Sequence, residues 1–187
     1  MIIIGVTGSF GAGKGEVADY LVNRKGFKHY SARRFIFEEA KRRGLDISKG
    51  REVLIPVGND LRREHGPAYI IESLYKQAVT EGVDAVIESL RVVAEVKRLQ
   101  ELGGYVIGVD ADPHLRFERS IKRGSETDSV SYEEWIDHER RESNSHDPAK
   151  QDIFGALKAS DCVVQNNGTK EELHDQIKEA LKKLEAR

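Results

Sequence analysis

The stretch Gly8-Ser9-Phe10-Gly11-Ala12-Gly13-Lys14 decides how the rest of this 187-residue chain is interpreted. It follows a β-branched run at residues 2–4 and leads into an amphipathic segment with helical spacing, from about residue 13 to residue 23. A strand, a glycine loop and a helix in this order can wrap backbone N–H groups around an anion at the positive end of the helix. The stretch therefore predicts a phosphate-binding loop that is formed by Gly8, Ser9, Phe10, Gly11, Ala12, Gly13 and Lys14.

Lys14 is placed to reach the β- and γ-phosphates of ATP. Ser or Thr normally follows this lysine and offers Mg²⁺ a hydroxyl ligand, but here Gly15 and then Glu16 follow it. Three interpretations stay open: Mg²⁺ held mainly by nucleotide oxygens, water and acids elsewhere; Glu16 as a ligand at longer reach; or nucleotide binding without transfer. Gly15 and Glu16 are included in the predicted nucleotide site, with ATP and Mg²⁺ as cofactors.

Apolar strand-like runs alternate with amphipathic stretches, which predicts an α/β fold with a five-stranded, mainly parallel sheet covered on both faces. The predicted strands are Ile2–Thr7, Phe27–Tyr30, Val83–Ser89, Tyr105–Ala111 and Asp161–Gln165. The length suits a single domain. Two polar stretches, about 31–66 and about 124–148, are expected to be insertions: an acceptor-binding arm and a lid.

The charge balance argues against a nucleic-acid partner. The chain has 30 Lys+Arg and 32 Asp+Glu, a net charge of −2, and its basic run Lys41-Arg42-Arg43 is short and lacks interleaved aromatic residues. Cys162 is the single cysteine and cannot form an internal disulfide. No apolar run approaches the roughly 18–20 residues that span a bilayer, so we expect a cytoplasmic protein without a membrane partner.

Glu88 is the candidate acid of the site. It ends the third predicted strand, and the carboxyl ends of parallel strands meet at the crevice where ligands bind. Glu88 is therefore expected to be catalytic and to hold Mg²⁺ through water, although a helix cap with an ion pair is the alternative. Arg91 lies beside it and suits an acceptor phosphate, with Glu95 one helical turn further on to hold Arg91 in place.

Further arginines are candidates for binding the acceptor. Arg33 and Arg34 follow the second strand, and Arg62 lies on the stretch after it. The alternative for Arg62 is that its segment is only an amphipathic helix, kinked at Pro56, and both interpretations can hold together.

Gly-Ala-Gly-Lys-Gly at residues 11–15 resembles the loop of adenylate kinases, which carry threonine where this chain has Glu16. The wider layout resembles the nucleoside-monophosphate kinase superfamily, including dephospho-CoA kinases, phage-type deoxynucleoside-monophosphate kinases and archaeal kinase-like proteins with a Gly-Lys-Gly-Glu loop. This resemblance implies the three-layer P-loop NTPase fold. The ending at residues 160–169 is similar to the last strand and turn of dephospho-CoA kinases, which implies contact of Asn167 and Gly168 with the adenine.

After the second predicted strand, the chain differs from dephospho-CoA kinases, which it resembles. Those enzymes usually carry an acid here to activate an acceptor hydroxyl, whereas this chain has arginine. That comparison implies an acceptor that carries phosphate, because phosphate needs positioning more than it needs a base.

The same resemblance gives a role to the helix after Pro113. In such kinases, arginines at this helix end and in the lid neutralise the transferring phosphoryl group, which implies catalytic roles for Arg119 and Arg123. Arg116 lies on the same helix. A solvated surface position is the alternative for each of these residues.

Together these features predict ATP-dependent phosphoryl transfer to a small, nucleotide-like acceptor, a nucleoside or deoxynucleoside monophosphate. The alternatives are a dephospho-CoA kinase and a regulatory or non-catalytic nucleotide-binding protein. Base preference, the choice between ribose and deoxyribose, and oligomeric state are not predicted.

Overall fold

The computed structural model describes residues 1–122, 131–143 and 147–185, and within them five parallel strands form one sheet. The strand order is β2-β3-β1-β4-β5. The strands are β1 (Ile3–Gly8), β2 (Lys28–Ser31), β3 (Ala85–Leu90), β4 (Tyr105–Asp110) and β5 (Cys162–Gln165). The predicted five-stranded parallel sheet is confirmed, and the predicted strand ends are displaced by only one or two residues.

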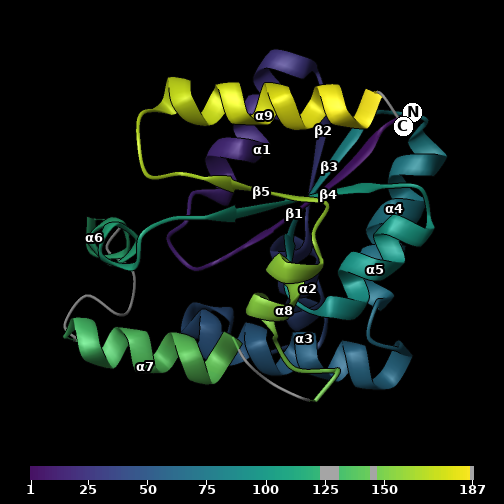
Figure 1. Ribbon diagram of the computed structural model, residues 1–187. Coiled ribbons are helices and arrows are strands. Elements are labelled where there is room, and N and C mark those ends of the chain that lie inside the picture. Colours follow the sequence, from purple (N-terminus) through teal and green to yellow (C-terminus); the bar gives the residue numbers. More distant parts are fainter. Residues whose placement is uncertain (123–130, 144–146, 186–187) are drawn as a thin grey trace.

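Helices cover both faces of this sheet, as Figure 1 shows. Helices α1 and α9 lie together over one face, whereas α4, α5 and α8 cover the other. The helices are α1 (Lys14–Lys25), α2 (Ala32–Arg42), α3 (Arg51–His65), α4 (Tyr69–Glu81), α5 (Val93–Glu101), α6 (Pro113–Lys122), α7 (Tyr132–Ser143), α8 (Ile153–Ala159) and α9 (Lys170–Glu185), with a 3₁₀ turn, η1 (Ile47–Lys49). Within the described ranges, none of the helices has both the length and the apolarity needed to cross a bilayer.

Strand β1 lies at the centre of the sheet and is buried along its whole length. Successive side chains of a strand point to opposite faces, so Ile4 and Val6 enter the core under α1 and α9, while Ile3 enters the core under α4 and α5. A parallel strand that is buried on both faces needs this continuous apolar run. This run is the reason that the sequence alone predicts β1.

Several helix ends match their sequence signals. Helices α1 and α4 stop at Gly26 and Gly82, which adopt the left-handed conformation. At the start of α9, the backbone N–H of Thr169 donates to Glu172 (2.8 Å) and the N–H of Glu172 donates to the Thr169 hydroxyl (3.2 Å). Ser131 and Glu134 exchange the same two bonds at the start of α7, so both helices begin with a capping box.

The phosphate loop is packed tightly against the segments on either side of it. Gly11 has φ +75°, and a Cβ at this position would collide with the backbone carbonyl of Arg116. Gly13 has φ +97°, and a Cβ there would collide with the side-chain amide of Asn166. Gly15 is different, because a Cβ would meet nothing within 4 Å. The loop therefore requires glycine at residues 11 and 13, but not at residue 15.

We expect Gly11→Ala to lower the free energy of unfolding by about 2 kcal/mol, because it combines a left-handed backbone with a backbone collision. The matched variant Gly15→Ala, on the first turn of α1, is expected to raise the free energy of unfolding by roughly 0.5 kcal/mol. Urea denaturation of the two variants beside the wild type measures both changes. Equal effects of the two substitutions would contradict the packing described for the loop.

Candidate functional site

A cavity of about 590 Å³ opens where the phosphate loop meets α2, α3 and the end of β3. Of the described residues that line it, five are basic and one is acidic: Lys14, Arg33, Arg51, Arg62 and Arg91, against Glu88. Part of the wall is apolar and is formed by Ile36, Leu54, Ile55 and Trp135. This composition suits a ligand that combines anionic groups with an apolar or flat portion.

The structure places the predicted phosphate loop at the cavity. Phe10, Gly11 and Lys14 line the cavity, while Gly8, Ser9, Ala12 and Gly13 complete the loop between β1 and α1. The Lys14 ammonium donates to the carbonyl oxygens of Gly8 and Ser9, each at 2.9 Å. The lysine thus lies folded over the loop, at the position where a phosphate would be held.

Arg116 ties the loop to two other elements from behind. Its Nε donates to the Ala111 carbonyl (3.0 Å) and its Nη1 donates to the Phe10 carbonyl (3.2 Å). Nη1 also donates to the Glu139 carboxylate on α7, and the guanidinium carbon lies 5.3 Å from the centre of the Trp135 ring. Arg116 and Glu139 are each only 5% exposed as side chains. Arg116 therefore positions the loop and α7 and is not a surface residue.

The end of β3 departs from regular strand geometry. Ser89 has φ +76°, and the pairing register of β1 and β3 shifts between Val6 and Thr7. Neighbouring side chains of a regular strand point to opposite faces, yet Glu88 and Ser89 both line the cavity. Among the described residues, Ser89 is the one non-glycine residue with positive φ. Strained backbone of this kind is concentrated at functional sites.

Glu88 is bound to His29 of β2. The His29 Nε2 and the Glu88 Oε2 are 3.0 Å apart. Ser31 pairs directly with Glu88 in the strand register, and His29, two residues before Ser31, lies on the same face of the sheet. The hydrogen bond from His29 lowers the pKa of Glu88, and Lys14 and Arg91 act in the same direction. The same bond raises the pKa of His29. Glu88 is thus held ionised in the cavity.

Arg62 and Arg91 are arranged differently from each other. The Glu95 carboxylate accepts bonds from Nε and Nη2 of Arg62, at 3.0 and 2.8 Å, and this ion pair is buried. Glu95 was expected to hold the Arg91 side chain, but it instead accepts the backbone N–H of Arg91 at 2.6 Å. Burial lowers the pKa of Arg91 to about 10. Among the described residues, no hydrogen-bond partner reaches the buried Nη1 of Arg91.

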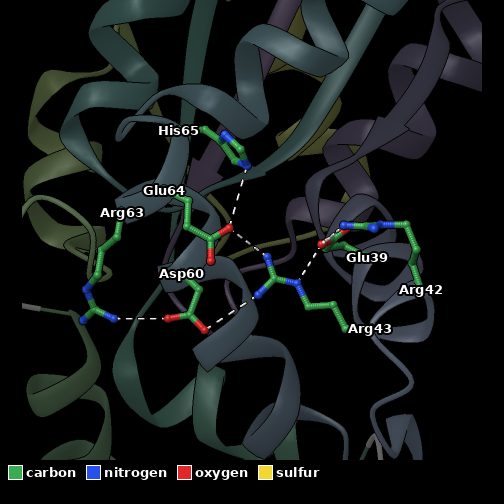
Figure 2. A network of polar contacts seen from close by, with 7 residues as sticks. All are labelled: Glu39, Arg42, Arg43, Asp60, Arg63, Glu64 and His65. Carbon is green, nitrogen blue, oxygen red and sulfur yellow. Dashed lines mark hydrogen bonds and ion pairs between the residues drawn. The ribbon is translucent and has the colours of Figure 1, made fainter.

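An ion-pair network holds together the two helices that carry Arg33, Arg51 and Arg62 (Figure 2). Arg43 at the end of α2 donates to Glu39 (2.6 Å) and, across to α3, to Glu64 (3.1 Å). Arg42 also donates to Glu39, and the two arginines lower the pKa of Glu39 to about 2. Arg42 and Arg43 of the basic run 41–43 therefore pair with acidic residues of α2 and α3.

The residues after Lys14 bear on where Mg²⁺ would be held. Glu16 accepts a bond from the Lys170 ammonium (2.7 Å) and lies 3.3 Å from the Nε2 of His174, both on α9. Glu16 is not among the described residues that line the cavity, whereas Glu88 is. Mg²⁺ usually keeps several waters and needs one or two carboxylates beside the phosphates. Glu88 fits that requirement, whereas Glu16 is engaged elsewhere.

The loop between β5 and α9 lies against the phosphate loop. The Asn166 side-chain amide donates to the Ala12 carbonyl at 2.8 Å and is buried. Asn167 accepts the backbone N–H of Asp112 at 2.7 Å, and Gly168 is exposed beside it. The two residues expected to contact the base are thus next to the phosphate loop, although they are not among the described residues that line the cavity.

Other predicted site residues lie outside the described lining of the cavity. Arg34 is exposed, and its backbone N–H is capped by the Ser31 hydroxyl. Arg119 is half-buried on α6, next to the lining residue Ser120. Arg123 lies outside the residues that the structure describes.

The sequence interpretation missed Arg51, Ser89, His29 and Gln151. Arg51 opens α3 directly after Gly50, and only the packing of α3 turns it into the cavity. The strained turn at Ser89 has no sequence signal, because the residue is not glycine. His29 reaches Glu88 from a neighbouring strand that is distant in sequence.

Comparisons with known proteins agree with this geometry. Residues 4–147 match the family model described as an AAA domain. A UPF0200 protein of Methanothermobacter thermautotrophicus is 31% identical over 187 residues, which cover 98% of this chain and 91% of the relative. The chain belongs to the AAA domain family and to the UPF0200 proteins. A UPF0200 protein of Thermococcus gammatolerans is 29% identical and also matches 98% of the chain.

Solved structures of kinases share the fold. Shikimate kinase from Bacteroides thetaiotaomicron superposes with a TM-score of 0.56 at 15% identity, covering 98% of both chains. Dephospho-CoA kinase from Campylobacter jejuni superposes with a TM-score of 0.52 at 18% identity, covering 97% of this chain and 96% of that enzyme. At these identities the likeness shows the fold alone, and the predicted P-loop kinase-like fold is confirmed.

The strained turn at the end of β3 gives a stability prediction. Ser89→Gly is expected to be more stable than Ser89→Ala by about 1 kcal/mol, because glycine adopts positive φ without the Cβ penalty. Both variants lose the hydroxyl, so the difference between them reports on the backbone alone. Urea denaturation measures it, and a less stable glycine variant would rule out the strain.

The His29–Glu88 pair gives a pH prediction. The raised pKa of His29 adds stability that is complete below its ordinary value of 6.5 and is lost as the pH rises through the raised value. The lowered pKa of Glu88 adds stability that is complete above its ordinary value of 4.5 and is lost as the pH falls through the lowered value. The pair therefore stabilises the fold most between about pH 4.5 and pH 6.5.

We expect His29→Gln to reduce the free energy of unfolding at pH 5.5 by less than about 1 kcal/mol, since His29 is partly exposed. At pH 9 the reduction should be smaller, because the contribution of the pair is lost as the pH rises through the raised pKa of His29. His138→Gln, at an exposed position on α7, is the control and should show no such pH dependence. An equal effect of His29→Gln at both pH values would contradict the charged pair.

Proposed function

We propose that this protein transfers the γ-phosphoryl group of ATP to the phosphate of a nucleoside or deoxynucleoside monophosphate. The observation that carries the proposal is the shared cavity, where Lys14 of the phosphate loop, Arg33 of α2 and Arg91 after β3 all face one space. Donor and acceptor phosphates repel each other, so bringing them together requires cations from both sides. The P-loop kinase-like fold supports the same class of reaction.

In this proposal each group has a positioning or electrostatic role. The loop amides and Lys14 hold the ATP phosphates, and Asn167 and Gly168 lie beside the base. Arg33 and Arg91 hold the acceptor phosphate, with Arg34 and Arg62 as further candidates. When bound, Mg²⁺ neutralises the β- and γ-oxygens, and Glu88 would hold it through water. Arg119 and Arg123 remain proposed stabilisers of the transferring group.

The transfer itself requires no covalent intermediate on the protein. An oxygen of the acceptor phosphate forms a bond to the γ-phosphorus while the bond between that phosphorus and the β,γ-bridging oxygen breaks, and ADP leaves with that oxygen. Holding the two oxygens in line accounts for most of the catalysis in such a reaction. The apolar wall at Ile36, Leu54, Ile55 and Trp135 suits the base of a nucleotide acceptor.

A hydroxyl acceptor, as in dephospho-CoA, is the second candidate. Glu88 favours this candidate, because a carboxylate in the cavity can accept the proton of an acceptor hydroxyl. However, the bond from His29 lowers the pKa of Glu88 and so weakens it as a base. The arginines of the cavity therefore favour the phosphate acceptor.

A coupled assay for ADP release tests the proposal, with ATP, Mg²⁺ and a panel of ribo- and deoxynucleoside monophosphates beside dephospho-CoA. We expect turnover with at least one monophosphate, and Lys14→Ala should lower kcat/KM about 10²-fold or more because a cation at the transferring phosphate is lost. Turnover of dephospho-CoA without turnover of any monophosphate would contradict the proposed acceptor and favour the hydroxyl acceptor. ATP binding without any turnover would support the non-catalytic alternative. Unchanged ATP affinity in Lys14→Ala would contradict the proposal that the loop binds the ATP phosphates.

A further inference from the structure

The aromatic ring of Phe10 lies beside two guanidinium groups from different parts of the chain. The Cζ of Arg51 lies over the ring at 4.5 Å from its centre, and the Cζ of Arg91 lies over it at 5.0 Å. Arg51 opens α3, Arg91 follows β3, and Phe10 belongs to the phosphate loop. All three residues line the same cavity.

Two cations so near one ring repel each other, and burial increases that cost. Burial is the main cause that lowers the pKa of Arg91 to about 10, and the charge of Arg51 acts in the same direction. With its pKa at about 10, Arg91 is still charged at neutral pH. The negative face of the ring and the carboxylates of Glu88 and Glu95 offset part of the cost at Arg91, and a bound anion would offset more of it. The buried Nη1 of Arg91, which has no hydrogen-bond partner among the described residues, is available for such an anion.

We propose that the Phe10 ring is a positioning element that holds Arg51 and Arg91 as a paired guanidinium site for a phosphate monoester. Arg51 thereby becomes an acceptor-binding residue. The inference rests on the proposed function for the identity of the acceptor, but its geometry is independent of phosphoryl transfer. A phosphate monoester fits because it is a dianion with several acceptor oxygens, and guanidinium groups bind such oxygens bidentately.

The backbone and the side chain of Phe10 have separate roles in this arrangement. The Phe10 carbonyl is held from behind by Nη1 of Arg116, at 3.2 Å, and this bond does not involve the ring. Removing the ring should therefore leave the path of the phosphate loop, and with it the donor site, in place. The loop would bind the donor through its backbone and prepare the acceptor site through one side chain.

Isothermal titration with ribose 5-phosphate, as the monoester probe, tests this inference. The protein is first saturated with Mg²⁺ and β,γ-imido-ATP, which fills the donor site, and ribose serves as the uncharged control. Phe10→Leu and Arg51→Gln are expected to weaken monoester binding about tenfold, because each removes one side of the cation–π contact. Phe10→Tyr, which keeps an aromatic ring, should bind nearly as the wild type does. Arg24→Gln, at an exposed position on α1, should change nothing.

The affinity for β,γ-imido-ATP is measured for every variant. Unchanged monoester binding in Phe10→Leu would overturn the inference, as would an equal loss of β,γ-imido-ATP binding, which would mean that the ring only supports the donor loop. A wild type that binds β,γ-imido-ATP but not ribose 5-phosphate would overturn the inference and leave ATP binding intact. The monoester titration is repeated without nucleotide. Failure of ATP binding would contradict the proposed function, whereas monoester binding in this second titration would still test the paired guanidinium site.

Discussion

The buried guanidinium of Arg116 joins the three elements on which the site depends. It donates to the carbonyl of Phe10 in the phosphate loop, to the carbonyl of Ala111 after β4, and to Glu139 on α7. A buried charge is tolerated only when it is paired and hydrogen-bonded, so these partners must all stay in place together. The loop therefore owes its shape to packing from behind as well as to its glycines.

The arginines of this protein fall into two groups that composition cannot distinguish. Arg62 and Arg43 have carboxylate partners on other helices, Glu95 and Glu64, and they join helices to one another. Arg91 keeps a buried Nη1 that no described residue satisfies, and it shares the Phe10 ring with Arg51. Buried polar groups in native proteins normally have partners, and this exception, on a residue that lines the cavity, supports the proposed anion site. The described lining of the cavity therefore carries an excess of positive charge, although the whole chain has a net charge of −2.

The two residues after Lys14 do not supply the hydroxyl that Ser or Thr normally offers to Mg²⁺. Gly15 leaves open space beyond its Cα, and Glu16 turns toward Lys170 and His174 on α9. Their bonds lower the pKa of Glu16, with Lys170 as the main cause, so its carboxylate stays ionised as an anchor for the last helix. Among the described residues, Glu88 is the acid that lines the cavity.

By itself, the sequence determined the class of fold and the position of the phosphate loop, because both depend on local patterns. The apolar run before Gly8, the spacing of Gly8, Gly13 and Lys14, and the capping boxes at Ser131 and Thr169 each act within a few residues of chain. Only the tertiary structure decided which polar side chains share the cavity. The Arg62–Glu95 pair, the His29–Glu88 pair and the Arg51–Phe10–Arg91 contact join residues that are 33, 59 and at least 40 positions apart, and no local pattern encodes them. The conformation of Ser89 could not be predicted from the sequence either, because packing at the end of β3 holds it at a positive φ that serine rarely adopts.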